Sequence, residues 1–366
     1  MLPSVVQCIV KTEIKDIEKN ILPVDWFPEV TAFPDKINKS IEIVIVPKLA
    51  DDPTANQKNV AIVWNEHNIL TILSTVYAHV VITEINTEDD LTQLASRKPD
   101  LVFSGVKYFE FDDRTIWLND YLELHKIAYM ASGSQSLENE GDKSKAKTIM
   151  RLAKIKTADF FITSPGKHTN KQSIPLKFPL FIKPVSGGDS RGIDANSVVH
   201  DFKGFVAKVL DIKTKLNLDS LVETYLPGKE YSVGILQDCI NGTLIAMPIE
   251  IIVKENENGY CILDFNIKKT DVETVIAVTD LKIFKKLSKL AKCSFNALDG
   301  KSLGRIDIKM NHLGVPHFME ANLMPGLSKG YFYRSCLLNL GMTYNDMILS
   351  IAKNGLSTRQ RKLNSL

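Results

Sequence analysis

Short apolar runs recur along the first third of the chain, and segments of a different periodicity separate them. The runs are rich in β-branched residues and lie at 41–47, 59–64, 78–85, 100–106 and 127–132. Between the later runs, segments 89–98 and 115–126 have the apolar spacing of helices. Strands that alternate with helices predict a parallel sheet covered by helices, and therefore an α/β domain.

The rest of the chain predicts a mixed second section and a third section rich in strands. In the second section we expect a helix at 141–155, a strand at 178–184 with a glycine-rich turn after it, and a helix at 201–212. In the third we expect strands at 221–236, 243–253 and 259–265, a hairpin turn at 256–259 and an amphipathic helix at 281–292. The basic stretch 353–366 predicts a frayed, solvated end.

Length and composition favour a soluble protein with more than one core. The 366 residues are 44% hydrophobic, which predicts two or three domains. The net charge is +2 and no basic run is interleaved with aromatic residues, so nucleic acid is not expected as a partner. The sequence has no apolar run of about 18 residues and no secretory signal, which predicts a cytoplasmic protein without a membrane span. Five scattered cysteines with no C-x-x-C pair argue against zinc or redox chemistry and predict buried or incidental thiols.

Segment 304–322 contains two alternating runs on either side of a turn at Leu313-Gly314. If these two residues form the loop, the register pairs His312 with Val315. The same register pairs Asp307 with Glu320 and Arg305 with Asn322. Directly opposed residues of antiparallel strands point to one face, so the hairpin would gather these four polar side chains together.

Two close carboxylates repel each other unless a positive charge lies between them. Oxygen donors from two acids and an amide suit Mg²⁺, which takes further ligands from water and phosphate. Arg305 could then hold a developing anion. A surface ladder in which Arg305 neutralises both acids is the alternative interpretation, and a slip of one residue would scatter the set.

Segment 179–194 places Lys183 at the end of an apolar strand, before Gly187, Gly188 and Gly192. Small residues let backbone N–H groups approach phosphate oxygens, although an ordinary hairpin tip has the same composition. Lys143 and Lys268 could equally be solvated lysines. Further acids, Glu223 and Glu230, flank a Pro-Gly turn and suit an adenine amino group and ribose hydroxyls, or are two exposed acids.

Taken in order, these segments resemble those of the ATP-grasp carboxylate-amine ligases, and among them the D-alanine-D-alanine ligases. The resemblance covers about residues 130–352 and rests on DKSKAK (142–147), FIKPVSGGDSRGI (181–193), LVETYLPGKEYSV (221–233), LDFNIKK (263–269), GRIDIKM (304–310) and MEANLMPG (319–326). It implies a three-domain ATP-grasp fold of the α/β (α+β) class. Its domains would be a Rossmann-like pre-ATP-grasp domain at 1–140, a central subdomain at 141–226 and a C-terminal subdomain at 227–366.

The resemblance also implies a role for each site residue. The residues that would contact the nucleotide are Lys143, Lys183, Gly187, Gly188, Ser190, Glu223, Leu226, Glu230 and Lys268. Glu223 and the Leu226 backbone would bind adenine, Glu230 the ribose and Lys268 the γ-phosphate. Asp307, Glu320 and Asn322 would ligate two Mg²⁺ ions, for which Mn²⁺ could substitute. Catalysis would rest on Lys268 and on Arg305, which steadies the tetrahedral intermediate. Homodimerisation is a further expectation from the family.

The sequence departs from the family where D-alanine would be recognised. FSGVKYFEFDDRTIW (103–117) stands where the family has a segment with a histidine and several glycines, and the family's early acidic residue has no clear counterpart here. Asp189 stands where the family has a serine, and SKGYFYR (328–334) stands where it has Ser-x-Ser. Residues Asp189, Gly326, Tyr331, Tyr333 and Arg334 are candidates for a rebuilt substrate pocket.

We therefore expect an ATP-dependent ligase that forms an amide through an acyl phosphate, from amino acids other than D-alanine or from an amino acid and a larger carboxylate, in specialised biosynthesis. Its partners would be small carboxylate and amine substrates. An authentic D-alanine-D-alanine ligase and a nucleotide-binding protein without catalysis are the alternatives. The intact set Arg305, Asp307, Glu320 and Asn322 argues against the last of these.

Overall fold

The structure is a computed structural model that describes residues 36–46, 61–62, 64–112, 114–188, 190–238 and 241–364. Half of the strand expected at 59–64 lies outside these residues, and Ala61 within it forms an isolated bridge to Val106. The described residues contain no helix that is both long and apolar enough to cross a bilayer.

A parallel sheet forms the first section, as the alternating pattern predicted. Its strand order is β2-β1-β3-β6, with β1 (Ile37–Ile45), β2 (Tyr77–Glu84), β3 (Leu101–Ser104) and β6 (Ala128–Tyr129). The helices are α3 (Glu66–Ser74), α4 (Glu88–Arg97) and α5 (Leu118–Leu124). The helix expected at 115–126 is wrong at its start, because residues 114–117 form strand β5 (Arg114–Trp117), which pairs with β4 (Tyr108–Phe111).

The second section is an antiparallel sheet with a core of its own. Its order is β7-β10-β8-β9, with β7 (Phe160–Thr163), β8 (Leu180–Pro184), β9 (Val198–Val199) and β10 (Ser220–Thr224). Helix α8 (Phe202–Leu216) packs on it through Phe205, Val209 and Ile212. The section opens with α6 (Ser134–Gly141) and α7 (Lys143–Leu152) and also holds the short 3-10 helix η1 (Lys171–Ser173).

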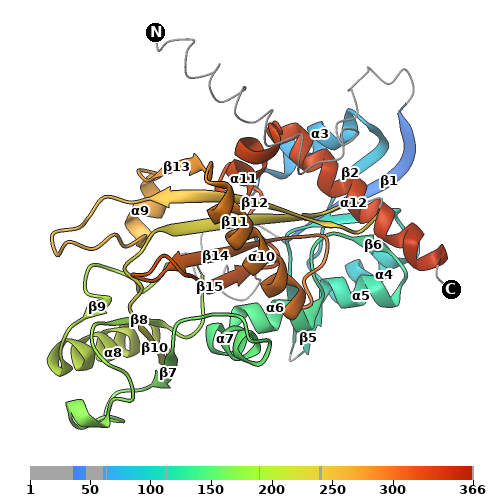
Figure 1. Cartoon of the computed structure of the whole chain (residues 1–366). Coiled ribbons are helices and arrows are strands. Elements are labelled where there is room, and N and C mark those ends of the chain that lie inside the picture. The colour runs from blue at the N-terminus through green and yellow to red at the C-terminus, as the bar shows by residue number, and fades with distance from the viewer. Residues whose placement is uncertain are drawn as a thin grey trace.

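The third section is a five-stranded antiparallel sheet in the order β13-β12-β11-β14-β15 (Figure 1). The strands are β11 (Glu230–Gln237), β12 (Leu244–Ile252), β13 (Thr274–Ala277), β14 (Leu303–Met310) and β15 (Pro316–Asn322). A turn at 256–259 is confirmed by the bond from the Gly259 N–H to the Asn256 carbonyl, but it joins no hairpin among the described residues. The strand expected at 259–265 is wrong, because 260–264 is irregular and helix α9 (Phe265–Thr270) follows it.

Two helices cover opposite faces of this third sheet. Phe295 of α10 (Leu281–Ala297) lies against Gly304 of β14, and Ser335 of α11 (Tyr331–Leu340) lies against Gly234 of β11. Gly234 pairs with Arg305, the residue after Gly304, and successive residues of a strand face opposite ways. Helix α11 therefore shares the face on which Arg305 lies, which positions it beside the polar end of the β14–β15 hairpin.

The last helix returns to the first section, so the expectation of a frayed end at 353–366 is wrong for the described residues. Helix α12 (Tyr344–Asn364) lies beside α3 and β6 (Figure 1). Its Gly355 is so close to the sheet that an added Cβ would lie 2.7 Å from Leu101 Cδ1. Met347, Ile348 and Ile351 of α12 belong to one hydrophobic core that joins the first and third sheets. The domain boundaries near 140 and 226 stay a prediction.

Candidate active site

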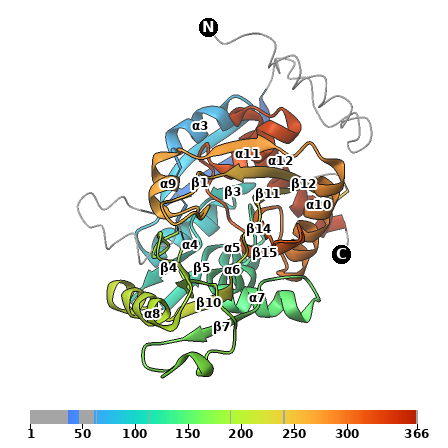
Figure 2. The same cartoon turned by 60° about the vertical axis from the view of Figure 1, so that its left-hand side comes forward.

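A cavity is lined by residues of the second and third sheets. Figure 2 shows strands β7 and β10 of the second sheet below β14 and β15 of the third. The cavity lining includes Lys147, Lys183, Ser190, Glu223, Leu226, Glu230, Lys268, Asp307, Lys309 and Glu320. It also includes the apolar and aromatic residues Phe181, Tyr225, Ile262, Leu263 and Met319. The cavity thus joins apolar side chains that suit a planar base to cations that suit phosphates.

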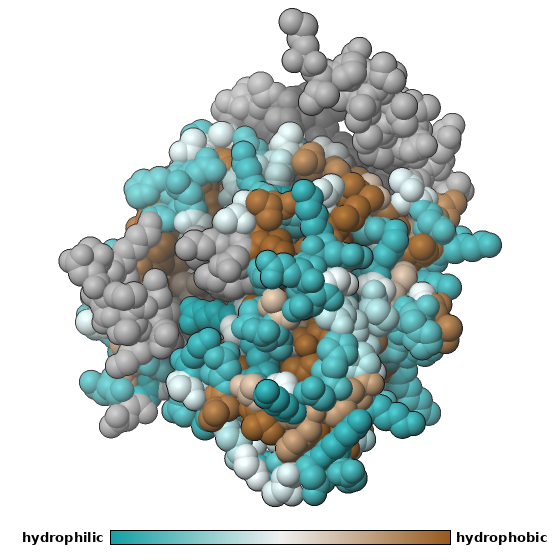
Figure 3. All heavy atoms as spheres, turned by 90° about the vertical axis from the view of Figure 1, so that its left-hand side faces the viewer, coloured by the Kyte–Doolittle hydropathy of each residue, from teal (hydrophilic) through white to brown (hydrophobic). Residues whose placement is uncertain are grey.

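Figure 3 shows an outer face of the molecule where hydrophilic residues predominate and hydrophobic ones are visible between them.

The β14–β15 hairpin brings the predicted polar set together. Asp307 pairs with Glu320 and Arg305 with Asn322, as the assumed register required. The assumed loop is nevertheless wrong, because the Asn311 N–H bonds to the Val315 carbonyl and leaves a three-residue tip. A bulge at Met319 then shifts the pairing by one residue, so that Ile308 pairs with Phe318. The two departures cancel at the end that carries the acids.

Arg305 and Asp307 form the centre of this face. The Arg305 guanidinium donates to both Asp307 carboxylate oxygens, from Nε at 3.0 Å and from Nη2 at 2.9 Å. Ser232 of β11 adds a bond of 2.7 Å to Asp307 Oδ1. Arg305 thus bonds to one of the two acids, but the pair is largely buried and so differs from the surface ladder of the alternative interpretation. The three bonds hold the Asp307 carboxylate rigidly for a cation.

The donor set fits Mg²⁺ that is shared with a nucleotide. Asp307, Glu320 and Asn322 supply oxygens, and the buried Nδ2 of Asn322 has no hydrogen-bond partner among the described residues. The described residues contain no group of three or more His, Cys, Asp or Glu side chains able to hold a metal ion by themselves. Phosphate oxygens would therefore have to complete the coordination, as is usual for Mg²⁺. The number of ions stays a prediction.

Glu320 remains ionised because cations surround it. Burial acts to raise its pKa, but Lys143, Lys268 and Lys183 outweigh this effect and hold the pKa at about 2. A carboxylate that is ionised at neutral pH is the form that ligates a metal. The three lysines come from α7, α9 and β8, so three separate elements each supply one cation that stabilises the charged form of Glu320.

The glycine-rich turn lies against the start of helix α7. The Lys143 N–H bonds to the Val185 carbonyl at 3.0 Å, and Lys143 Nζ donates to the Gly187 carbonyl. Burial lowers the pKa of Lys143. Gly187 has φ +89, a conformation that disfavours other residues. Gly187 and Gly188 are exposed, and Asp189 lies outside the described residues.

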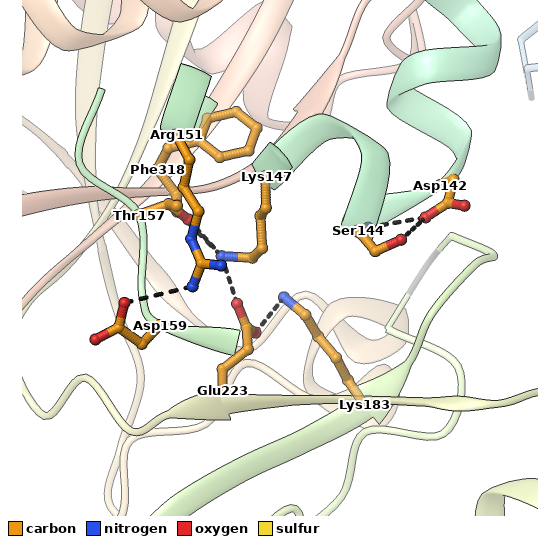
Figure 4. Close-up of polar contacts among 9 residues, drawn as sticks. All are labelled: Asp142, Ser144, Lys147, Arg151, Thr157, Asp159, Lys183, Glu223 and Phe318. Carbon is orange, nitrogen blue, oxygen red and sulfur yellow. Dashed lines mark hydrogen bonds and ion pairs between the residues drawn. The ribbon is translucent and has the colours of Figure 1, made fainter. Parts of the chain in front are cut away.

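Glu223 receives a lysine on each oxygen (Figure 4). Lys147 Nζ pairs with Oε1, and Lys183 Nζ lies 2.9 Å from Oε2. Burial acts to raise the pKa of Glu223, but the two lysines outweigh it and the pKa is lowered. Sequence reasoning missed Lys147, although it is the last residue of the DKSKAK motif and lies one helical turn after Lys143.

Glu230 also has a partner that sequence reasoning missed. Lys309 of β14 lies directly opposite Glu230 of β11, with its Nζ 2.8 Å from Glu230 Oε2. The same Nζ donates to the Cys261 carbonyl at 3.2 Å. The register of β14 contained the signal, because Lys309 lies two residues after Asp307 and therefore on the same face.

The segment before helix α9 closes one side of the cavity. Cys261, Ile262 and Leu263 line it, and Ser190 Oγ donates to the Leu263 carbonyl at 3.2 Å. Asp264 caps α9, which carries Lys268 into the cavity lining. Among the described residues, Cys261 and Cys293 are exposed free thiols and Cys336 is a buried one.

Tyr331 lies beside Arg305, and Arg334 lies beside Tyr331. The Arg305 guanidinium lies 5.7 Å from the Tyr331 ring centre, and the Tyr331 hydroxyl donates to Glu273 at 2.7 Å. Burial, together with Glu273, raises the pKa of Tyr331. Arg334 donates to both oxygens of Asp271 at 2.5 Å. The other two candidates lie apart from this network: Tyr333 packs against Tyr344 of α12, and Gly326 follows β15 in an irregular segment.

Comparisons with known proteins relate the chain to the D-alanine–D-alanine ligases. Residues 149–353 match the family described as D-ala D-ala ligase C-terminus. A D-alanine–D-alanine ligase of Pediococcus pentosaceus is 31% identical over 235 residues, which cover 63% of this chain and 62% of that protein. D-alanine–D-alanine ligase A of Bacillus cereus is 27% identical over 84% of this chain and 97% of that protein.

A solved structure shares the whole architecture. The D-alanine–D-alanine ligase of Bacillus anthracis, complexed with ATP, superposes with a TM-score of 0.65 at 20% identity and covers 88% of this chain and 99% of that one. The fold and its facing sheets thus define a protein of the ATP-grasp class. Since the family match covers more than half of the 366 residues, the chain belongs to the D-alanine–D-alanine ligase family, whose members are ADP-forming ligases that make C–N bonds.

Proposed function

We propose that the protein is an ATP-dependent ligase that joins a carboxylate to an amine and that its substrates differ from D-alanine. The observation that carries the proposal is that Asp307 and Glu320 line a cavity together with Lys183 and Glu223, while Arg305 and Asn322 pair beside the two acids on the same face of the β14–β15 hairpin. Family membership supports ligation, and the ATP-bound relative of the same fold supports a nucleotide in this cavity.

The reaction begins with the attack of one anion, a carboxylate, on another, ATP. Such a step needs positioning and cations more than a protein nucleophile. A carboxylate oxygen attacks the γ-phosphorus, and ADP leaves with the electron pair of the broken P–O bond. The amine nitrogen then attacks the acyl carbon of the acyl phosphate, phosphate leaves with the electron pair of the C–O bond, and the nitrogen loses a proton. Mg²⁺ held by Asp307, Glu320 and Asn322 would neutralise phosphate oxygens during the transfer.

The residues of the chain would divide these tasks. Glu223 and the Leu226 backbone take the base, and Glu230 takes the ribose. Lys143, Lys183 and Lys268 offset the charge of the phosphates, with backbone N–H groups of Gly187, Gly188 and Ser190 closing over them. Arg305, held by its two bonds to Asp307, faces the oxygen that becomes negative in the tetrahedral intermediate.

A second network supports a rebuilt acceptor pocket. Lys107, in the segment that replaces the family's histidine and glycines, pairs with Glu140 at 2.5 Å. The other oxygen of Glu140 accepts the N–H of Leu323, the residue after Asn322. The ring of Tyr331 lies 5.7 Å from the Arg305 guanidinium. Both contacts change the surroundings of the polar face of the β14–β15 hairpin, which supports a substrate other than D-alanine.

Phosphate release from ATP and Mg²⁺ across pairs of amino acids and dipeptides tests the proposal, with mass spectrometry of the product. We expect release that requires one pair, yields the mass of both substrates minus water and disappears in Glu320→Gln. Turnover with D-alanine alone would instead identify an authentic D-alanine–D-alanine ligase, which the relatives' names favour. Tight ATP binding without turnover across a broad panel would favour a binding protein.

A further inference from the structure

We propose that Lys147 is a positioning residue that fixes the Glu223 carboxylate for the amino group of a purine and also holds the β15 bulge that aligns Glu320 with Asp307. The inference rests on the proposed nucleotide site. It adds a residue that contacts both the base-binding side and the metal-binding side of the cavity.

Lys147 is a charged side chain in a place that disfavours charge. Its side chain is 0% exposed, and it points from α7 into the space between the second and third sheets (Figure 4). A buried ammonium loses its hydration, which costs several kcal/mol unless partners replace the water. The partners are Glu223 Oε1 and Thr157 Oγ1, the latter at 2.6 Å, with the Phe318 carbonyl at 3.4 Å.

The first partner links Lys147 to base recognition. Glu223 lies at the end of β10 and has its other oxygen on Lys183. With an ammonium at each oxygen, the carboxylate plane cannot rotate without breaking an ion pair. A carboxylate fixed in this way presents its remaining lone pairs in one direction. It would accept from the amino group of adenine and would repel the carbonyl oxygen that hypoxanthine carries at the same position.

The other two partners link Lys147 to the bulge. Thr157 Oγ1 donates to the Phe318 carbonyl at 2.8 Å, and the Phe318 N–H bonds to the Lys156 carbonyl at 2.8 Å. Phe318 therefore bonds to segment 156–157 beside β15 at the point where the register shifts. Phe318 lies on β15, the edge strand of the third sheet, so its outward N–H and carbonyl have no neighbouring strand, and Lys156, Thr157 and Lys147 supply the partners. The residue after the bulged Met319 is Glu320.

The test measures equilibrium binding of Mg²⁺·ATP and of Mg²⁺·inosine triphosphate to the full-length protein by calorimetry, so that turnover is not needed. Lys147→Met keeps the length of the side chain and removes its charge. We expect ATP affinity to fall about tenfold or more, the loss of one charge-assisted hydrogen bond, while inosine triphosphate affinity changes much less. Lys147→Arg, which stays cationic, should restore most of the selectivity. Lys145→Met, an exposed lysine of the same helix, is the matched control and should bind like the wild type.

Thr157→Val tests the second half of the inference separately. It preserves the shape and removes the hydroxyl between Lys147 and Phe318. We expect the Mg²⁺ concentration needed for half-maximal ATP binding to rise several-fold, with the ratio of ATP to inosine triphosphate affinity unchanged.

A folded Lys147→Met protein with wild-type base selectivity and wild-type Mg²⁺ dependence would overturn the inference. If that variant does not fold, the other two variants decide. Wild-type Mg²⁺ dependence in Thr157→Val would overturn the role at the bulge. Loss of base selectivity in Lys147→Arg, with Mg²⁺·ATP still stabilising the protein, would overturn the role at Glu223. Failure of the wild type to bind either nucleotide would instead refute the proposed function.

Discussion

At the scale of single residues, ion pairs between different elements hold the site. Glu223 of β10 pairs with Lys147 of α7 and Lys183 of β8, and Glu230 of β11 pairs with Lys309 of β14. When one partner of a buried pair is removed, the other is left as an uncompensated charge, at a cost of about 3–5 kcal/mol. Substitutions at the site therefore change both folding and binding, so each prediction below relies on a ratio or on a matched control.

Lys309→Met should weaken ribose recognition. Lys309 orients Glu230 by a bond of 2.8 Å, and without it the carboxylate gains rotational freedom. We expect the preference for ATP over 2′-deoxy-ATP and 3′-deoxy-ATP to fall about tenfold, the value of one charge-assisted hydrogen bond. Competition binding of the three nucleotides measures it. Lys229→Met is the control, because Lys229 is exposed and pairs with Glu250 on the same sheet, and an equal change in both variants would contradict the prediction.

ATP affinity should fall as the pH rises above about 8. Burial, together with the charges of Lys183 and Arg151, lowers the pKa of Lys147 to about 8, although Glu223 partly offsets this. Below this pH the ammonium pairs with Glu223, and above it Glu223 loses one of its two cations. The nearby His317 has a lowered pKa and does not titrate in this range. Binding titrations from pH 7 to 9.5 test this. Lys147→Arg should reduce the alkaline fall, and the fall that remains would belong to Lys143, whose pKa is also lowered.

At the scale of elements, the turn that joins β10 to β11 depends on a close approach. The Gly228 N–H bonds to the Met310 carbonyl at 2.9 Å, and an added Cβ would lie 2.6 Å from that oxygen. Gly228→Ala should therefore push β11 away from the end of β14, next to the Glu230–Lys309 pair, and lower the free energy of unfolding by about 1–3 kcal/mol. Urea unfolding measures it. Gly141→Ala, where an added Cβ meets nothing within 4 Å, should leave stability unchanged or raise it slightly.

The β14–β15 hairpin illustrates how far sequence reasoning reaches. Alternation placed Arg305, Asp307, Glu320 and Asn322 on one face, because side-chain direction follows from strand period alone. The loop was wrong by one residue and the Met319 bulge was missed. The bulge lies next to Phe318, which pairs with Thr157 from a segment far away in sequence, and alternation within the hairpin gives no signal for such a contact. The partners Lys147 and Lys309 were missed for a similar reason. Each ion pair joins two strands or a strand and a helix whose pairing no single segment encodes.

Irregular segments were the hardest to predict. Residues 259–265 have an apolar, aromatic composition that predicts a strand, but the described backbone forms no strand there and instead lines the cavity. Its carbonyls bond to Lys309 and Ser190 rather than to a neighbouring strand. Tertiary contacts thus decided the conformation against local propensity, as happens at ligand sites.

At the scale of the whole molecule, helix α12 joins the end of the chain to the first sheet. Met347, Ile348, Ile351 and Ala352 are 0% exposed and follow helical spacing, a signal that was present in the sequence and was hidden by the basic residues after it. The first and third sheets share one hydrophobic core, to which α12 contributes, whereas the second sheet has its own. The second sheet is connected to the rest through α6 and α7, whose Leu137, Ala146 and Met150 belong to the shared core, and we expect it to respond less than the other two sheets to a change in that core.

Ile351→Ala tests this division. Deleting a fully buried Ile side chain from the shared core should lower the free energy of unfolding by about 2–5 kcal/mol, while Lys353→Ala, an exposed position two residues on, should change it by less than about 0.5 kcal/mol. Because Ile351 lies in the core of the first and third sheets, we expect hydrogen exchange to rise in β3, β6 and α12 and to stay unchanged in β7, β8 and α8. Equal loss of protection in all three sections would show instead that they unfold as one unit, and that nucleotide binding at the cavity stabilises the whole chain together.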